Sequence, residues 1–172
     1  MTPLPGALGG QDLIAWRLDQ WKHRETWDSG EGAYLGGGRW NGKGIRAVYC
    51  AVDPATAILE VAVHKGFKAL DTVPHTLTSF RIADPKTVHI VDPAEVPNPN
   101  WLKPGLASAG QQEFGNQLLA RSKYILVPSV VSEHSWNLVF VASVAKGTYV
   151  VRSQERFALD TRLHPPVIPT VR

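Results

Sequence analysis

The chain has 172 residues, of which 44% are hydrophobic and 19% charged, and its formal net charge is +3. These values indicate one globular domain and exclude a disordered chain, and no apolar run is long enough to cross a bilayer. The Lys and Arg residues are scattered, so we expect no basic stripe for nucleic acid. A single cysteine, Cys50, and a first segment without the basic and apolar parts of a secretory signal favour a cytoplasmic protein.

The N-terminal quarter carries few regular signals. Residues 1–12 are expected to form a loose leader, residues 15–18 a short strand, and residues 21–27 a loop or a helical turn. A glycine-rich loop then ends near Gly44. Residues 46–51 alternate between two faces, with apolar side chains on both, which predicts a strand.

The clearest helix begins after Asp53. The Asp53 side chain can accept from the free N–H groups of the first turn, and Pro54 suits the first helical position. The helical pattern continues through residues 55–65, and Gly66 is placed to end it.

The second half alternates strands with one more helix. Residues 92–105 contain four prolines and predict a loop, whereas residues 108–123 predict a helix despite Gly110 and Gly115. We expect further strands at residues 76–82, 87–91, 124–131, 137–142, 149–152 and 156–159. The sum is a single mixed α+β domain over residues 1–172, with a core at about 13–163 and a Pro-rich tail. The chain shows no regular βαβ alternation, which argues against a doubly wound parallel sheet.

The segment 36–42 places Arg39 and Trp40 among glycines. Glycine allows a sharp turn and a close approach by another group, and a guanidinium suits phosphate or carboxylate. On these residues alone, an anion-binding loop and a surface turn in which the two side chains stack are equally supported. The segment matches neither the P-loop nor the dinucleotide fingerprint.

Two further residues stand out beside the first helix. Glu60 lies among apolar residues, with His64 four positions on, and a buried carboxylate needs either a partner or a function. Pairing with His64 or a nearby Arg is the alternative to a catalytic role. Tyr49, on the preceding strand, either packs in the core or stacks on a planar ligand.

Ser129 follows Pro128 at the end of an apolar strand. It lacks the Gly-x-Ser-x-Gly elbow of a serine hydrolase, which favours a strand-end hydroxyl over a nucleophile. No metal site is expected, because the histidines are dispersed and form no ligand motif.

Several segments, taken in order, carry a family resemblance. They are Trp16-Arg17-Leu18, Gly37-Gly38-Arg39-Trp40-Asn41, Val48-Tyr49, Ala57 to Glu60, Val127-Pro128-Ser129, Asn137-Leu138 and Phe157 to Leu163. The chain, from about residue 15 to residue 163, resembles the RES-domain toxins of bacterial toxin–antitoxin pairs. The family is named for an Arg, a Glu and a Ser, which correspond here to Arg39, Glu60 and Ser129.

The resemblance implies a fold similar to the ADP-ribosyltransferases, with a split, mostly antiparallel sheet flanked by helices. It implies a toxin that degrades NAD⁺ by hydrolysis or phosphorolysis of the nicotinamide–ribose bond, so that NAD⁺ is the substrate, inorganic phosphate a candidate co-substrate, and no cofactor is needed. The implied partner is an Xre-like helix-turn-helix antitoxin that occludes the active site, with the toxin as a homodimer inside the hetero-oligomer. No membrane or direct nucleic-acid contact is implied.

The same resemblance assigns roles to individual residues. Glu60 would stabilise the oxocarbenium-like transition state, Arg39 would hold the pyrophosphate, and Tyr49 would stack on nicotinamide. Ser129 would orient the nicotinamide amide or the ribose. Further candidates for NAD⁺ binding are Arg17 as a second phosphate ligand, Trp40 as a pocket wall for which plain packing is the stronger alternative, and Asn137.

Two other functions remain open on the sequence. The first is an ADP-ribosyltransferase that modifies a specific host protein, which would share the oxocarbenium step and differ only in its nucleophile. The second is a non-catalytic module for nucleic acid or partner recognition, although the scattered basic residues disfavour nucleic acid.

Overall fold

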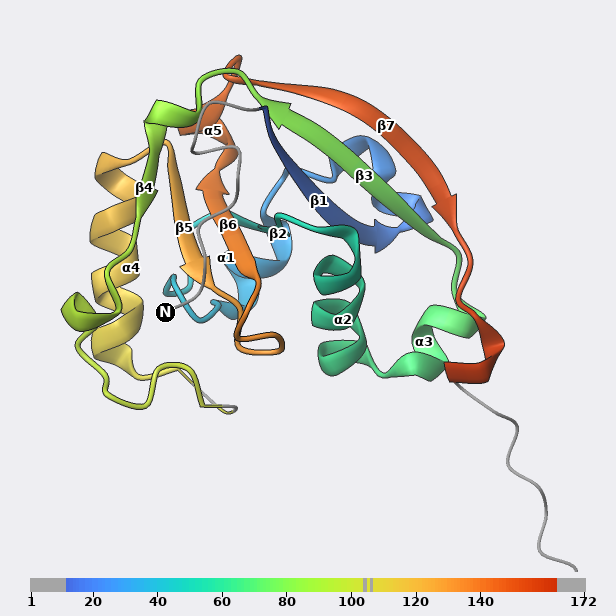
Figure 1. Ribbon diagram of the computed structural model, residues 1–172, viewed down its shortest axis with the longest axis horizontal. Coiled ribbons are helices and arrows are strands. Elements are labelled where there is room, and N and C mark those ends of the chain that lie inside the picture. The colour runs from blue at the N-terminus through green and yellow to red at the C-terminus, as the bar shows by residue number, and fades with distance from the viewer. Residues whose placement is uncertain (1–11, 104, 106, 164–172) are drawn as a thin grey trace, which may run out of the picture.

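The computed structural model describes residues 12–103, 105 and 107–163 (Figure 1). The tail after Leu163 and all but the last residue of the expected leader lie outside these residues. The described chain forms one seven-stranded sheet in the order β4-β5-β6-β2-β1-β3-β7. Only β4 and β5 are parallel neighbours, so the mostly antiparallel α+β prediction is confirmed.

The strands are β1 (Leu13–Gln20), β2 (Ala47–Ala51), β3 (His75–Ile82), β4 (Val88–Ile90), β5 (Tyr124–Pro128), β6 (Trp136–Val141) and β7 (Tyr149–Phe157). The α-helices are α1 (Glu31–Gly36), α2 (Pro54–Lys65), α3 (Phe67–Thr72), α4 (Ala109–Arg121) and α5 (Ala142–Ala145). Short 3-10 helices are η2 (Trp21–Thr26), η3 (Pro85–Thr87), η4 (Pro93–Glu95) and η5 (Thr161–Leu163).

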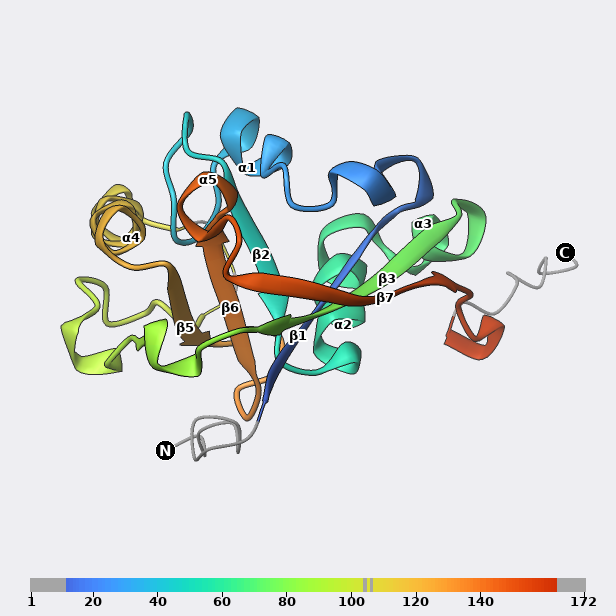
Figure 2. The ribbon, with the colours of Figure 1, turned by 90° about the horizontal axis from the view of Figure 1, so that it is seen from above.

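The sheet is split between β1 and β2. These two strands share one residue pair, Trp16 with Ala51, whereas β1 pairs with β3 along its whole length and β2 with β6 likewise. Figures 1 and 2 show β1, β3 and β7 as a separate arch that leaves the direction of β2, β6 and β5. Helices α2 and α3 lie below this arch in Figure 1, and α4 lies beside β5. The predicted split sheet is therefore present, and α2 begins directly beside the joint.

Strand β2 separates two apolar cores. Val48 and Cys50 belong to a core with the aromatic rings of Trp27, Phe80 and Phe140. The alternate residues, Ala47 and Tyr49, face the second core, which includes the buried side of α4. The predicted strand is therefore present, and the structure shows that it is buried on both faces.

The predicted boundaries hold where a cap marks them. Asp53 Oδ1 accepts from Thr56 N at 2.8 Å, and Gly66 ends α2 with a φ of 78° that a side chain would disfavour. Helix α4 likewise starts after Ser108, whose hydroxyl accepts from Gln111 N at 3.1 Å.

Other predictions were wrong. A separate last strand at residues 156–159 does not exist, because β7 runs unbroken to Phe157 along β3. The sequence of β7 shows no clear alternation of apolar and polar residues, because this edge strand is exposed along most of its length. The short helices α1, α3 and α5 were missed, since each has only one or two turns and lacks a side-chain cap.

A buried histidine opens β3. The His75 side chain is 0% exposed, its Nδ1 lies 2.5 Å from Val73 O, and its Nε2 has no hydrogen-bond partner among the described residues. Burial lowers the pKa of His75, although the Val73 carbonyl opposes the shift. The lowered pKa favours the neutral imidazole in the folded chain at neutral pH.

We expect the unfolding free energy to fall as the pH drops below about 6.5, where the unfolded histidine takes up a proton that the folded one resists. Urea titrations between pH 7.5 and 5.5 measure this slope. His75→Gln should flatten it, whereas His64→Gln, at an exposed position on α2, should leave it unchanged. Equal slopes in wild type and His75→Gln would contradict the assignment.

Candidate functional site

Glu60 is held by two side chains from other strands. It lies half-buried in the middle of α2, and its Oε1 accepts from Ser129 Oγ at 3.0 Å and from Asn137 Nδ2 at 2.5 Å. Among the described residues, Oε2 has no hydrogen-bond partner, and no hydrogen bond or ion pair joins Glu60 to His64. The carboxylate is thus anchored through one of its two oxygens.

The Ser129 hydroxyl donates to the Glu60 carboxylate and is shielded from solvent. Its side chain is 0% exposed, and Oγ accepts from Val131 N at 3.2 Å and Ser132 N at 3.3 Å while it donates to Glu60. A hydroxyl has one donor and two acceptor sites, so all three are used. The geometry agrees with a strand-end hydroxyl and gives no sign of a nucleophile.

A second contact ties the same loop to the start of α2. Residues 129–135 connect β5 to β6, and at their far end Ser135 Oγ donates to Asp53 and accepts from Thr56 Oγ1 at 2.9 Å. Partial burial alone would raise the pKa of Asp53, but hydrogen bonds from Ser135 and Thr56 outweigh it and lower the pKa. Because Asp53 and Glu60 are about two helical turns apart, the loop is locked against α2 at both ends.

Arg39 lies on the turn between α1 and β2. Its Nη1 donates to Trp101 O at 2.9 Å and its Nη2 to Gly105 O at 3.2 Å. Burial lowers the pKa of Arg39, and the nearby Glu60 carboxylate is the largest opposing influence. The structure therefore brings Arg39 and Glu60 within electrostatic range, and three of the five guanidinium N–H groups have no acceptor among the described residues.

Tyr49 connects the Arg39 turn to the sheet. Its hydroxyl donates to Asn41 Oδ1 at 2.6 Å and accepts from Trp40 N at 3.0 Å. Burial raises the pKa of Tyr49, so the phenol stays protonated and keeps its donor. The Trp40 indole is 2% exposed and packs against Trp101 at 5.5 Å between ring centroids, which makes it a core residue.

Sequence reasoning missed Asn41. This side chain is 0% exposed, and its amide NH₂, with two N–H donors, lies within hydrogen-bond distance of the carbonyl oxygens of Ala33, Gly42 and Ile45. An asparagine directly after a glycine-rich turn was the available signal, since its side chain can replace backbone partners in turns.

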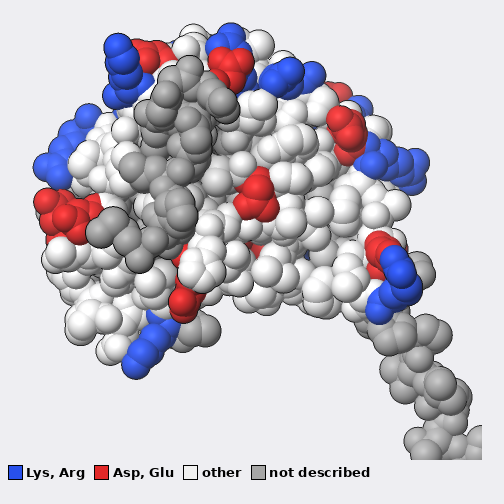
Figure 3. Space-filling view, viewed as in Figure 1, with Lys and Arg blue, Asp and Glu red and all other residues white. Residues whose placement is uncertain are grey.

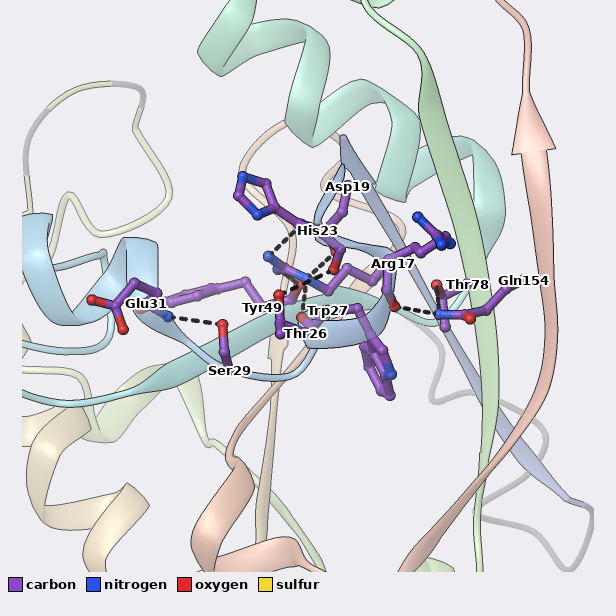
Figure 4. Close-up of polar contacts among 11 residues, drawn as sticks. Arg17, Asp19, His23, Thr26, Trp27, Ser29, Glu31, Tyr49, Thr78 and Gln154 are labelled. Atoms are coloured by element: carbon purple, nitrogen blue, oxygen red, sulfur yellow. Dashed lines mark hydrogen bonds and ion pairs between the residues drawn. The ribbon is translucent and has the colours of Figure 1, made fainter. Parts of the chain in front are cut away.

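Arg17 occupies the split between β1 and β2 (Figure 4). Its guanidinium donates to Tyr49 O at 2.7 Å and to Trp27 O at 3.0 Å, and it forms an ion pair with Asp19 at 2.7 Å. Burial would lower the pKa of Arg17, but Asp19, together with Cys50 and Asp28, outweighs the burial and raises the pKa. These partners give Arg17 a structural role, so its predicted contact with a phosphate gains no support.

Replacing Arg17 by Leu should lower the unfolding free energy by about 2–4 kcal/mol, because two carbonyl groups and the Asp19 carboxylate lose their partner. Urea denaturation measures the loss. Arg24→Leu is the control, since its ion pair with Glu25 is exposed and should contribute less than about 1 kcal/mol. An equally stable Arg17→Leu chain with weaker ligand binding would instead support a ligand contact.

The described residues contain no cluster of three or more His, Cys, Asp or Glu side chains arranged for a metal ion. Likewise, none of the helices in the described part of the chain has the length and apolar character needed to cross a membrane. On the face shown in Figure 3, Lys and Arg side chains stand apart around the outline and form no continuous stripe.

Comparisons with known sequences agree on one family. The RES domain family matches residues 14–160. Toxin Res of Photorhabdus laumondii subsp. laumondii is 32% identical over 155 residues, covering 88% of this chain and 97% of that toxin. Toxin Res of Pseudomonas putida is 30% identical over 155 residues, covering 88% and 99%. The Prs ADP-ribosylating toxin of Sphingobium sp. is 35% identical over 117 residues, covering 64% and 70%.

A solved structure shares the fold. The crystal structure of the M. tuberculosis MbcT-MbcA toxin–antitoxin complex contains a chain with a TM-score of 0.69 and 22% identity, covering 86% of this chain and 85% of that one. The α+β domain with its anchored carboxylate and glycine-flanked arginine thus belongs to the RES domain family. The two relatives that it covers almost in full are both Res toxins.

Proposed function

We propose that this chain is a toxin that degrades NAD⁺ by cleaving the bond between nicotinamide and ribose. The observation that carries the proposal is the Glu60 carboxylate, which is half-buried, anchored through Oε1, and without a hydrogen-bond partner at Oε2 among the described residues. Family membership and the names of the relatives support an enzyme of this class.

The chemistry needs little more than such a carboxylate. When the C1′–N bond breaks, its electron pair neutralises the nicotinamide ring, so the leaving group needs no general acid. Positive charge develops on the ribose, and a fixed anion close to it lowers the energy of that transition state. In hydrolysis, water then adds to this ribose carbon and releases a proton to solvent, which gives ADP-ribose. In phosphorolysis, inorganic phosphate adds to the same carbon, which is C1″ of the product ADP-ribose 1″-phosphate.

The remaining residues bind and orient in this proposal. Ser129 and Asn137 hold Glu60 in place, and Glu60 Oε2 accepts from a ribose hydroxyl. Arg39 offers its remaining N–H groups to the pyrophosphate. Tyr49 holds the turn through its hydroxyl, and because its ring packs against the second core, its stacking on nicotinamide stays a prediction.

The second candidate is transfer of ADP-ribose to a host protein. The name of the Sphingobium relative, an ADP-ribosylating toxin, favours it. Mass spectrometry of the products, with and without phosphate, separates the outcomes: free ADP-ribose indicates hydrolysis, the 1″-phosphate indicates phosphorolysis, and a modified protein indicates transfer.

An antitoxin partner belongs to the same proposal. The structural neighbour was solved as a toxin–antitoxin complex, and we propose an Xre-like antitoxin that covers the Glu60 site, a homodimer of the toxin within the complex, and action in the cytoplasm. We expect a helix-turn-helix protein to be encoded beside the gene, and its co-expression should restore growth and NAD⁺ levels.

Glu60→Gln should lower the rate of NAD⁺ cleavage about a hundredfold or more with little change in KM, because the lost charge acts in the transition state. The Gln carbonyl oxygen can still accept from Ser129 and Asn137, so the fold should persist. Glu95→Gln, at an exposed carboxylate on η4, is the control. A wild-type rate in Glu60→Gln would overturn the mechanism.

Arg39→Lys should raise KM for NAD⁺ about tenfold or more, because an ammonium cannot form the bidentate bonds of a guanidinium. Steady-state kinetics measure the change, and Arg46→Lys, an exposed arginine paired with Glu31, is the control. Full activity with Lys at position 39 would contradict a bidentate pyrophosphate contact.

A further inference from the structure

Helix α4 meets the Arg39 turn at three points. Gln112 Nε2 donates to Gly38 O at 2.8 Å, and Asn116 Oδ1 accepts from Gly42 N at 3.0 Å. Between them, a Cβ atom built on Gly115 would lie 2.1 Å from Trp40 O. Residues three and four apart share one face of a helix, so Gln112, Gly115 and Asn116 form a single contact surface.

This surface grips the turn on both sides of Arg39. The turn closes on itself through a hydrogen bond from Gly38 N to Asn41 O at 2.9 Å. The hydrogen bonds from α4 fall on Gly38, the first residue of this closed segment, and on Gly42, the residue that follows it. The backbone that carries Arg39 is therefore held from within and from the helix.

Gly115 is explained by the same contact. Glycine inside a helix is less favourable than alanine by about 1 kcal/mol, yet here any side chain would collide with the Trp40 carbonyl. Gly110, in the first turn of the same helix, has nothing within 4 Å of a built Cβ. The two glycines that weakened the helix prediction thus differ in kind, and only Gly115 is required by packing.

We propose that Gln112, Gly115 and Asn116 are positioning residues that hold the Arg39 guanidinium in register with the Glu60 carboxylate for binding the NAD⁺ pyrophosphate. The inference rests on the proposed function for the identity of the ligand. A displacement of about 1 Å at such a group is enough to weaken its contribution strongly. We call these three residues of α4 the clamp. Because the clamp acts through Arg39 and not through Glu60, its loss should raise KM for NAD⁺ much more than it lowers kcat.

The experiment compares two alanine substitutions in one helix. Gly115→Ala should raise KM for NAD⁺ about tenfold and speed hydrogen exchange at the amides of residues 38–42, whereas Gly110→Ala should change neither. Because Gly115→Ala carries a risk of misfolding, Gln112→Ala and Asn116→Ala provide milder versions. Asn116→Asp, which keeps the acceptor for Gly42 N, should restore both readouts toward wild type.

The outcomes separate the two proposals. Raised KM with near-normal kcat and faster exchange in the folded Gln112→Ala and Asn116→Ala chains would support the clamp. Wild-type KM and wild-type exchange in both would overturn it. A wild-type chain that leaves NAD⁺ intact would overturn the proposed function instead, and the exchange rates would still decide whether α4 holds the turn.

Discussion

The separation of β1 from β2 is the constraint on which the rest of the structure depends. One residue pair, Trp16 with Ala51, joins the two halves of the sheet, so backbone groups beyond it need other partners. Arg17 supplies one of them by donating to Tyr49 O and Trp27 O. The chain leaves the sheet at the end of β2, next to this residue pair, and α2 begins there with Asp53 as its cap.

The position of α2 explains why a carboxylate is tolerated among apolar residues. Glu60 faces the end of β5 and the start of β6, where Ser129 and Asn137 donate to the same oxygen. Burying an ionised group is unfavourable unless hydrogen bonds replace water, and these two bonds meet that requirement on one side only. In the proposed function the other oxygen accepts from the substrate, which is why we assign the chemistry to Glu60.

The turn that carries Arg39 is held by contacts that do not involve the Arg39 side chain. Tyr49 and α4 reach the Arg39 turn from different directions, the former through Asn41 and the latter through Gln112 and Asn116. Because none of these contacts uses the Arg39 side chain, the guanidinium is positioned without losing its donors to them. The result is a cation and an anion held by separate parts of the fold, within electrostatic range of each other.

The sequence by itself determined the helix from Pro54 to Lys65 and the mixed fold, because periodicity, the Asp53 cap and the Gly66 stop are local signals. The family followed from the resemblance carried by the ordered motifs. The sequence also identified Arg39, Glu60 and Ser129 as the residues to consider, through ordered motifs. The full extent of β7 and the roles of Arg17, Ser129, Asn41 and Gly115 were decided only by the tertiary structure. Apart from Asn41, whose partners lie within eight residues of it, each of these depends on a partner far away in the chain, such as β3, Tyr49 or Trp40. Local patterns carry no information about which distant groups a fold brings together.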